Sequence, residues 1–261
     1  MEQITSKDNR WIKEYGKLSS SKSYRDKQSL FVVESVKLIV EAFNNNQCFE
    51  MVFVTQTCFE KYSHELEKLF QLVQCYIITE EISKKITGLN SPQGIYGVCQ
   101  KCDKQLAIDK IYSDGKYIML VDLQDTGNVG AIIRTAEALG INGIIMTNKS
   151  CDIYNPKVIR GSMGSVFRME FMITDEPNAL LTNFKHNNVK TYASIIHTEA
   201  TSLPNVKFTS PSVLLIGNEG NGLTTEMQAL CSEKITINMA GNAESLNASM
   251  AACILMWEMT K

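Results

Sequence analysis

A single arginine within an otherwise apolar stretch is the first candidate for chemistry. Residues 120–135 read LVDLQDTGNVGAIIRT, in which Asn128 is placed to cap a helix and Arg134 follows one and a half turns later. A guanidinium among alanine and isoleucine side chains is costly to desolvate unless it meets an anion or a carboxylate. Arg134 is therefore a candidate for stabilising negative charge, and a structural salt bridge explains it equally well.

A glycine-rich loop follows a second apolar run, at residues 213–223, which read VLLIGNEGNGL. Glycines let a ligand approach the backbone closely, but the spacing G-x-x-G-x-G is neither the dinucleotide fingerprint nor a phosphate-binding loop. Glu219 within the loop also disfavours phosphate. A carboxylate at this place suits a hydroxyl group, an amine or a partner arginine.

The third segment, residues 235–249, reads ITINMAGNAESLNAS. A short strand enters a loop of small residues, and Ser245 is placed to cap the final helix. That helix is apolar on almost every side through Trp257, which indicates burial in the core or in a dimer interface. Ser245 and Asn247 are equally explained as ordinary residues of a helix start.

All three segments lie where a predicted strand gives way to a helix. Strands alternating with helices favour a mostly parallel sheet, and such sheets bind ligands outside the carboxyl ends of their strands. The strands expected in the second half are 117–121, 143–146, 190–196, 213–216 and 234–237.

The first hundred residues predict a separate, compact α/β unit. Its expected strands are 30–33, 51–54, 75–78 and 94–99, and its expected helices are 8–20, 35–43 and 64–72. Residues 101–116 are polar and charged and form the expected linker. The domains are therefore placed at 1–100 and 117–261.

Bulk charge argues mildly against a protein that holds nucleic acid by charge alone, because the net charge is -2 and the pI is about 6.0. Between Met1 and Leu38, however, eight basic residues face five acidic ones, a local excess of three positive charges. Such a run is either a solvated helix face or an arm that contacts phosphates.

Several classes of protein are disfavoured. The eight cysteines are scattered through a chain without a secretory signal, which argues against disulfides, and Cys99 and Cys102 form a lone pair without the second pair that zinc requires. No metal site is expected. No apolar stretch approaches about 20 residues, so the chain is expected to be cytoplasmic and not to span a membrane.

Together and in this order, the three segments resemble the signature motifs of the SpoU (TrmH-like) branch of the SPOUT RNA methyltransferases. The pattern N-x-G-x-x-x-R falls on residues 128–134, G-N-E-G-x-G on 217–222, and I-x-M-x-G-x-x-x-S-L-N on 237–247. The first hundred residues resemble, more weakly, the ribosomal-protein-like substrate-binding domain of many members. The departures Thr126, Asn238 and Ala248 fall outside the functional positions.

The resemblance implies an α/β catalytic domain with a deep trefoil knot that binds S-adenosylmethionine. The implied cofactor contacts are Leu215, Ile216, Gly217, Ile237, Met239, Ser245 and Leu246. It also implies a homodimer in which one subunit's Arg134 completes the other's site.

The implied reaction is methylation of a ribose 2'-hydroxyl, with ribosomal RNA of the large subunit favoured as substrate over transfer RNA. Arg134 is the implied catalytic group; because a guanidinium scarcely acts as a base, an RNA phosphate is the alternative proton acceptor. The implied positioning residues are Asn128, Glu219, Ser245 and Asn247. A non-catalytic RNA-binding protein and a nicotinamide-dependent oxidoreductase are the rival interpretations, and the latter lacks its glycine fingerprint.

Overall fold

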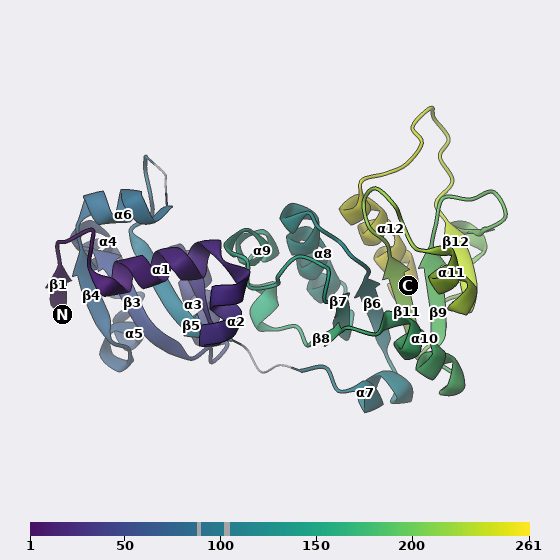
Figure 1. Cartoon of the computed structure of the whole chain (residues 1–261), viewed down its shortest axis with the longest axis horizontal. Coiled ribbons are helices and arrows are strands. Elements are labelled where there is room, and N and C mark those ends of the chain that lie inside the picture. Colours follow the sequence, from purple (N-terminus) through teal and green to yellow (C-terminus); the bar gives the residue numbers. More distant parts are fainter. Residues whose placement is uncertain (88–89, 102–104) are drawn as a thin grey trace. The chain divides into compact units, whose positions relative to one another are not determined.

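The computed structural model describes residues 1–87, 90–101 and 105–261, so Cys102 lies outside the described residues. The chain forms two compact units (Figure 1). Unit 1 comprises Met1–Asp103 and Asp152–Phe167, and unit 2 comprises Lys104–Cys151 and Arg168–Lys261. Each unit is a sheet with helices, as the predicted α/β class requires.

Unit 1 is built on a five-stranded mixed sheet in the order β1-β4-β3-β5-β2. Strands β1, β4 and β3 are parallel, whereas β5 runs antiparallel to β3 and β2. The strands are β1 (Glu2–Ile4), β2 (Leu30–Glu34), β3 (Phe49–Thr55), β4 (Cys75–Ile78) and β5 (Ile95–Gln100). The helices are α1 (Arg10–Ser20), α2 (Lys22–Gln28), α3 (Val36–Asn44), α4 (Gln56–Tyr62), α5 (Glu67–Leu72) and α6 (Glu80–Thr87).

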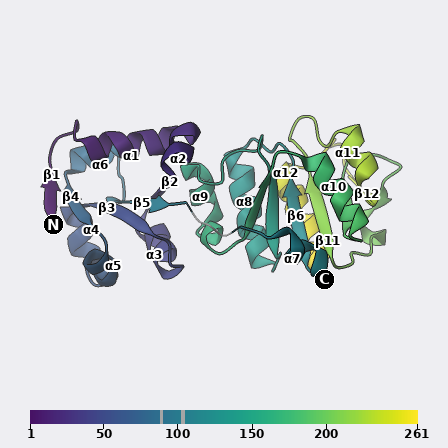
Figure 2. The ribbon, with the colours of Figure 1, turned by 60° about the horizontal axis from the view of Figure 1, so that its bottom comes forward.

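Helix α1 shows how the sequence pattern builds unit 1. Asn9 caps it by accepting a hydrogen bond from the backbone of Trp11, and Ile12, Tyr15 and Leu18, spaced three apart, form its buried face. These side chains pack with α6 on one face of the sheet, and α3, α4 and α5 lie on the other (Figure 2).

Residues 152–167, which lie late in the sequence, pack as part of unit 1 through α9 (Pro156–Ser162) and a short 3-10 turn (Ser165–Phe167). The Phe31 ring lies 4.9 Å from that of Tyr154, centroid to centroid. Arg25, which is 2% exposed, donates from Nε to Asp152 at 2.7 Å and from Nη1 to the Leu18 carbonyl at 2.6 Å.

Because Arg25 is buried, the basic N-terminal arm offers fewer positive charges to phosphates than the sequence suggests. Its guanidinium satisfies a buried carboxylate and cannot reach an external anion. Lys7 and Lys13 are also paired, with Glu81 at 2.9 Å and with Asp8 at 3.1 Å. The excess of positive charge in the sequence therefore exaggerates what α1 and α2 present to solvent.

Unit 2 is a seven-stranded, entirely parallel sheet in the order β10-β12-β9-β11-β6-β7-β8, as predicted from the alternation of strands and helices. The strands are β6 (Lys116–Leu120), β7 (Gly143–Thr147), β8 (Phe171–Thr174), β9 (Lys190–Ser194), β10 (Thr201–Ser202), β11 (Ser212–Ile216) and β12 (Glu233–Thr236). The helices are α7 (Ile108–Ser113), α8 (Thr126–Ala138), α10 (Pro177–His186), α11 (Thr225–Leu230) and α12 (Ala248–Thr260).

Helices cover both faces of this sheet. On one face, α7, α10 and α11 pack on alternate residues of the central strands, such as Met119 and Leu215. On the other face, α8 and α12 pack against each other, and α12 contacts β11 (Figure 2). Leu106 and Ile111 belong to the first of these cores, so part of the expected linker is a folded part of unit 2.

The cysteines within the described residues carry free thiols. Burial raises the pKa of Cys58, Cys75 and Cys231 to about 11, which keeps these thiols protonated and unreactive at neutral pH. Within the described part of the chain, no helix is long and apolar enough to cross a membrane.

Candidate functional site

The candidate site lies at one edge of the unit 2 sheet. Because all seven strands are parallel, their carboxyl ends meet at the same edge, and the loops after β6, β9, β11 and β12 gather there. Strand β11 lies directly between β6 and β9, and β9 lies beside β12. The topology thus brings together three motifs whose first residues are about 90 and about 20 residues apart in the sequence.

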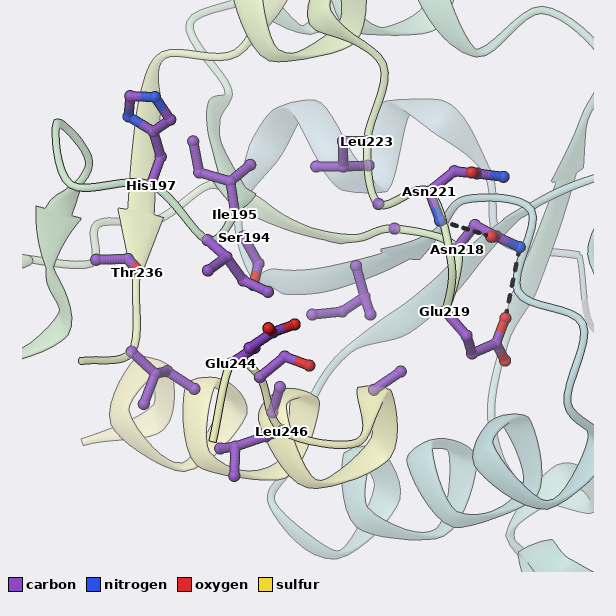
Figure 3. Close-up of a pocket in the computed structure, with 18 of the residues that line it drawn as sticks. Ser194, Ile195, His197, Asn218, Glu219, Asn221, Leu223, Thr236, Glu244 and Leu246 are labelled. Carbon is purple, nitrogen blue, oxygen red and sulfur yellow. Dashed lines mark hydrogen bonds between the residues drawn. The ribbon is translucent and has the colours of Figure 1, made fainter. Parts of the chain in front are cut away.

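The loops after β9, β11 and β12 enclose a pocket of about 420 Å³ (Figure 3). Six of the seven predicted cofactor contacts line it: Ile216, Gly217, Ile237, Met239, Ser245 and Leu246. Leu215 does not, because its side chain is fully buried in the core on the α10 side of the sheet. Aliphatic side chains and loop backbone suit a flat, largely uncharged ring such as adenine.

Gly217 is also required by the loop itself. A Cβ at this position would lie 2.3 Å from the backbone carbon of Gly222 and 2.6 Å from its carbonyl oxygen. The loop closes on itself there: Gly222 donates to the Asn218 carbonyl at 2.9 Å, and Asn218 donates back at 3.2 Å. The glycine therefore permits the tight loop, and the loop in turn lines the pocket.

Asn218, which sequence reasoning did not single out, holds this loop in place. Its Oδ1 accepts from the backbone of Gly220 at 3.0 Å and of Asn221 at 3.1 Å, and its Nδ2 donates to the Asp122 carbonyl at 2.8 Å. Asp122 has a φ of +53°, uncommon for a non-glycine residue, and its carboxylate accepts from the Thr147 hydroxyl at 2.7 Å. The ends of β6, β7 and β11 are thereby joined.

Glu219 joins the second motif to the first. Its Oε1 accepts from the backbone of Asp125 at 2.9 Å and from Asn128 Nδ2 at 3.2 Å, and its Oε2 accepts from the backbone of Gln124 at 3.2 Å. Burial tends to raise the pKa of Glu219, but these hydrogen bonds outweigh it and hold the pKa below its ordinary value. The carboxylate is therefore ionised, and its oxygens are used in structural hydrogen bonds.

Asn128 and Asn247 complete the network. Asn247 Nδ2 donates to Asn128 Oδ1 at 3.0 Å, and Asn247 Oδ1 accepts from the backbone of Ser249 at 2.9 Å. The network corrects two expected helix caps. Asp125 caps α8, with Asn128 in its first turn, and Asn247 rather than Ser245 caps α12.

Arg134 is exposed on α8 and does not line the pocket of its own chain. Within the described residues it has no hydrogen bond or ion pair, which removes the structural salt bridge as its explanation. Helix α8 packs against α12, and Thr135, next to Arg134, lies within 3.2 Å of the Cys253 thiol. Arg134 thus comes directly before a residue of α8 that contacts the last helix.

The loop after β9 was not predicted to be part of the site. Ser194, Ile195 and His197 line the pocket, as does Glu244 in the loop before α12 (Figure 3). The signal for the first three was present, because β9 was a predicted strand and its carboxyl end had to lie at the same edge. Nothing in the sequence marked Glu244 as a pocket residue, apart from its position next to Ser245.

A parallel sheet with a pocket of aliphatic and polar side chains at its carboxyl edge defines an enzyme-type site for a small, nucleotide-like ligand. The sequence model of the SpoU rRNA Methylase family matches residues 115–257, more than half of the chain, and that of the MRM3-like substrate binding domain matches residues 9–97. The chain belongs to the SpoU rRNA methylase family.

Similar proteins extend over almost the whole chain. A 23S rRNA (guanosine(2553)-2'-O)-methyltransferase of Bacillus subtilis is 28% identical over 99% of each chain. A 23S rRNA (uridine(2479)-2'-O)-methyltransferase of Streptomyces viridochromogenes is 27% identical over 98% of this chain and 90% of its own. An rRNA methyltransferase of Sinorhizobium meliloti with bound S-adenosylmethionine superposes with a TM-score of 0.83, at 26% identity, over 99% of this chain and 97% of its own.

These findings confirm the family, the fold class and the class of enzyme predicted from the three motifs, a methyltransferase that uses S-adenosylmethionine. The roles of individual residues stay predictions.

Proposed function

We propose that this chain transfers a methyl group from S-adenosylmethionine to a ribose 2'-hydroxyl of large-subunit ribosomal RNA. The observation that carries the proposal is the pocket at the carboxyl edge of the unit 2 sheet, at which the three motifs meet. The substrate class follows from the two full-length relatives, whose names both specify ribose methylation of 23S rRNA.

The cofactor would lie in this pocket with its adenine between Ile237 and Leu246 and against the backbone at Gly217. Leu246 is 37% exposed, so a ring placed on it removes apolar surface from water. Asn128, Glu219 and Asn247 act as positioning residues, since their polar atoms are used in bonds between the loops.

S-adenosylmethionine, when bound, would supply the methyl group and, as its carbon–sulfur bond breaks, a neutral thioether as leaving group. The 2'-oxygen would be the nucleophile, and its proton must leave. Because a guanidinium scarcely acts as a base, Arg134 serves to orient the hydroxyl and stabilise the developing alkoxide. An RNA phosphate accepts the proton.

A second copy of the chain brings Arg134 to the pocket. Three exposed apolar side chains form a stripe along the last helix: Met250, Ile254 and Trp257, between 42% and 60% exposed. The opposite side of α12 is buried, so this stripe is the surface that dimerisation would cover. Arg134 lies on α8, which packs against α12, and belongs to the partner's site.

Unit 1 serves as the RNA-reading domain, and the enzyme works in the cytoplasm. The match to a substrate-binding domain over residues 9–97 supports the first statement. We also propose that unit 2 contains a deep trefoil knot, because the chain belongs to the SpoU rRNA methylase family.

The test is transfer of labelled methyl groups from S-adenosylmethionine to separate pools of ribosomal and transfer RNA. We expect label in large-subunit RNA, recovered as a 2'-O-methylnucleoside after digestion. Label confined to transfer RNA would contradict the substrate, and label on bases would contradict the reaction.

A further inference from the structure

The pocket carries an unbalanced charge. Its lining, all of it within the described residues, includes two carboxylates, those of Glu219 and Glu244, and one histidine, His197, but no lysine or arginine. A concave site lined by charge of one sign concentrates ligands of the other sign. The pocket therefore favours a cation.

The two carboxylates differ in what they can offer a ligand. Glu219 accepts hydrogen bonds from two backbone N–H groups and from Asn128, and is occupied by them. Glu244 forms no hydrogen bond or ion pair with any described residue. Figure 3 shows its carboxylate pointing into the middle of the pocket from the loop before α12.

Glu244 lies next to Ser245 and Leu246, which are placed to contact the cofactor, and its carboxylate points into the space that a cofactor in the pocket would fill. S-adenosylmethionine carries a sulfonium, an ammonium and a carboxylate, with a net charge of about +1. Its product, S-adenosylhomocysteine, differs by the lost methyl group and the lost sulfonium charge.

We propose that Glu244 recognises the sulfonium and makes the pocket bind the cofactor more tightly than its demethylated product. This inference rests on the proposed function and adds a specificity-determining residue to it. Methyl transfer moves the bonding electron pair onto sulfur, so the positive charge facing Glu244 disappears in the same step. The attraction that retains the cofactor is lost once the reaction is complete, which favours release of the product.

The experiment titrates the full chain with S-adenosylmethionine, with S-adenosylhomocysteine, and with an analogue in which an amine-bearing carbon replaces the sulfonium and keeps its charge. The variant is Glu244→Gln, which keeps size and removes charge. The control is Glu226→Gln, at an exposed position on α11 outside the pocket.

We expect Glu244→Gln to weaken binding of both charged ligands about fivefold, the scale of a solvent-accessible ion pair, and binding of the neutral product less than about twofold. Added salt should weaken cofactor binding to the wild-type chain more than to the variant. Glu226→Gln should change none of these affinities.

An equal loss of affinity for all three ligands, or no loss for any, would overturn the role of Glu244. In both cases the wild-type chain still binds the cofactor, so the proposed function stands. A wild-type chain that binds neither cofactor nor product would instead refute the proposed function.

Discussion

The Glu219 carboxylate is a structural acceptor that depends on its charge. It receives hydrogen bonds from the backbone of Gln124 and Asp125 and from Asn128, which hold its pKa below the ordinary 4.5. A carboxyl group with a lowered pKa in the folded protein stabilises the fold above its unfolded pKa, and this contribution disappears as the pH falls through the folded value.

Glu219→Gln should therefore lower the melting temperature at neutral pH, because an amide places N–H groups against backbone donors. Between about pH 5 and about pH 3 the difference from the wild-type chain should shrink, since the wild-type carboxylate itself becomes protonated there. Thermal unfolding of both proteins, measured across this pH range, tests the expected change in the difference between their melting temperatures. A difference that stays constant with pH would show that the charge of Glu219 is irrelevant to the network.

Arg134 is the residue on which the proposed chemistry depends. Since it lies outside the pocket of its own chain, Arg134→Ala should leave the dissociation constant of S-adenosylmethionine within about twofold. The methyl transfer rate should fall by about 100-fold or more, the usual scale for losing one group that stabilises developing negative charge. Single-turnover assays and calorimetry separate the two effects, and retained turnover would remove Arg134 from the mechanism.

At the scale of elements, the loop after β11 limits which residues can stand at its start. Gly217→Ala would place a Cβ 2.3 Å from the Gly222 backbone, so the loop must open. We expect a loss of about 1–3 kcal/mol in the free energy of unfolding together with weaker cofactor binding. Gly220→Ala is the matched control, because a Cβ there would meet only the Asn218 Oδ1, at 3.7 Å. Equal effects of the two substitutions would contradict this account of the loop.

The elements were largely predictable wherever hydrophobic periodicity was strong. Strand β4 has the predicted bounds, and the predicted β9 extended two residues beyond the observed end at Ser194. Strand β1 and helix α2 were not foreseen, because short polar segments such as 2–4 and 22–28 have no periodic apolar pattern. They are fixed by pairing with β4 and by packing on β2.

The same distinction between local and long-range information separates the parts of the site that the sequence predicts from those that it does not. Motif residues were found from the sequence because strand ends, glycines and polar residues mark them locally. The two expected helix caps were wrong, because Asp125 and Asn247 cap the helices. Gly217 has a further role that the sequence did not indicate, which is to make room for its own loop. Which polar atoms pair across 90 residues depends on strand order, and strand order has no local signature.

At the scale of the whole molecule, the segment 152–167 depends on a buried ion pair. Arg25→Met removes the partner of Asp152, a carboxylate 7% exposed, and should cost about 3–5 kcal/mol in the free energy of unfolding. Lys13→Met breaks the exposed pair with Asp8 and should leave the free energy of unfolding nearly unchanged. Denaturant unfolding measures both, and similar costs would show that the Arg25 pair contributes no more than a surface pair.

Pairing of two chains completes the proposed active site and can be tested by combining two defects. One chain carries Arg134→Ala with an intact pocket, and the other carries Gly217→Ala with an intact Arg134. In a mixed dimer, the intact pocket of the first chain meets the intact arginine of the second.

The most direct measurement is therefore methyl transfer to large-subunit ribosomal RNA by the two variants, first separately and then co-expressed. Each variant alone should be nearly inactive. Random pairing makes half of the dimers mixed, each with one working site, so the co-expressed pair should recover about a quarter of the wild-type activity. Activity no greater than that of the separate variants would contradict a site shared between two chains.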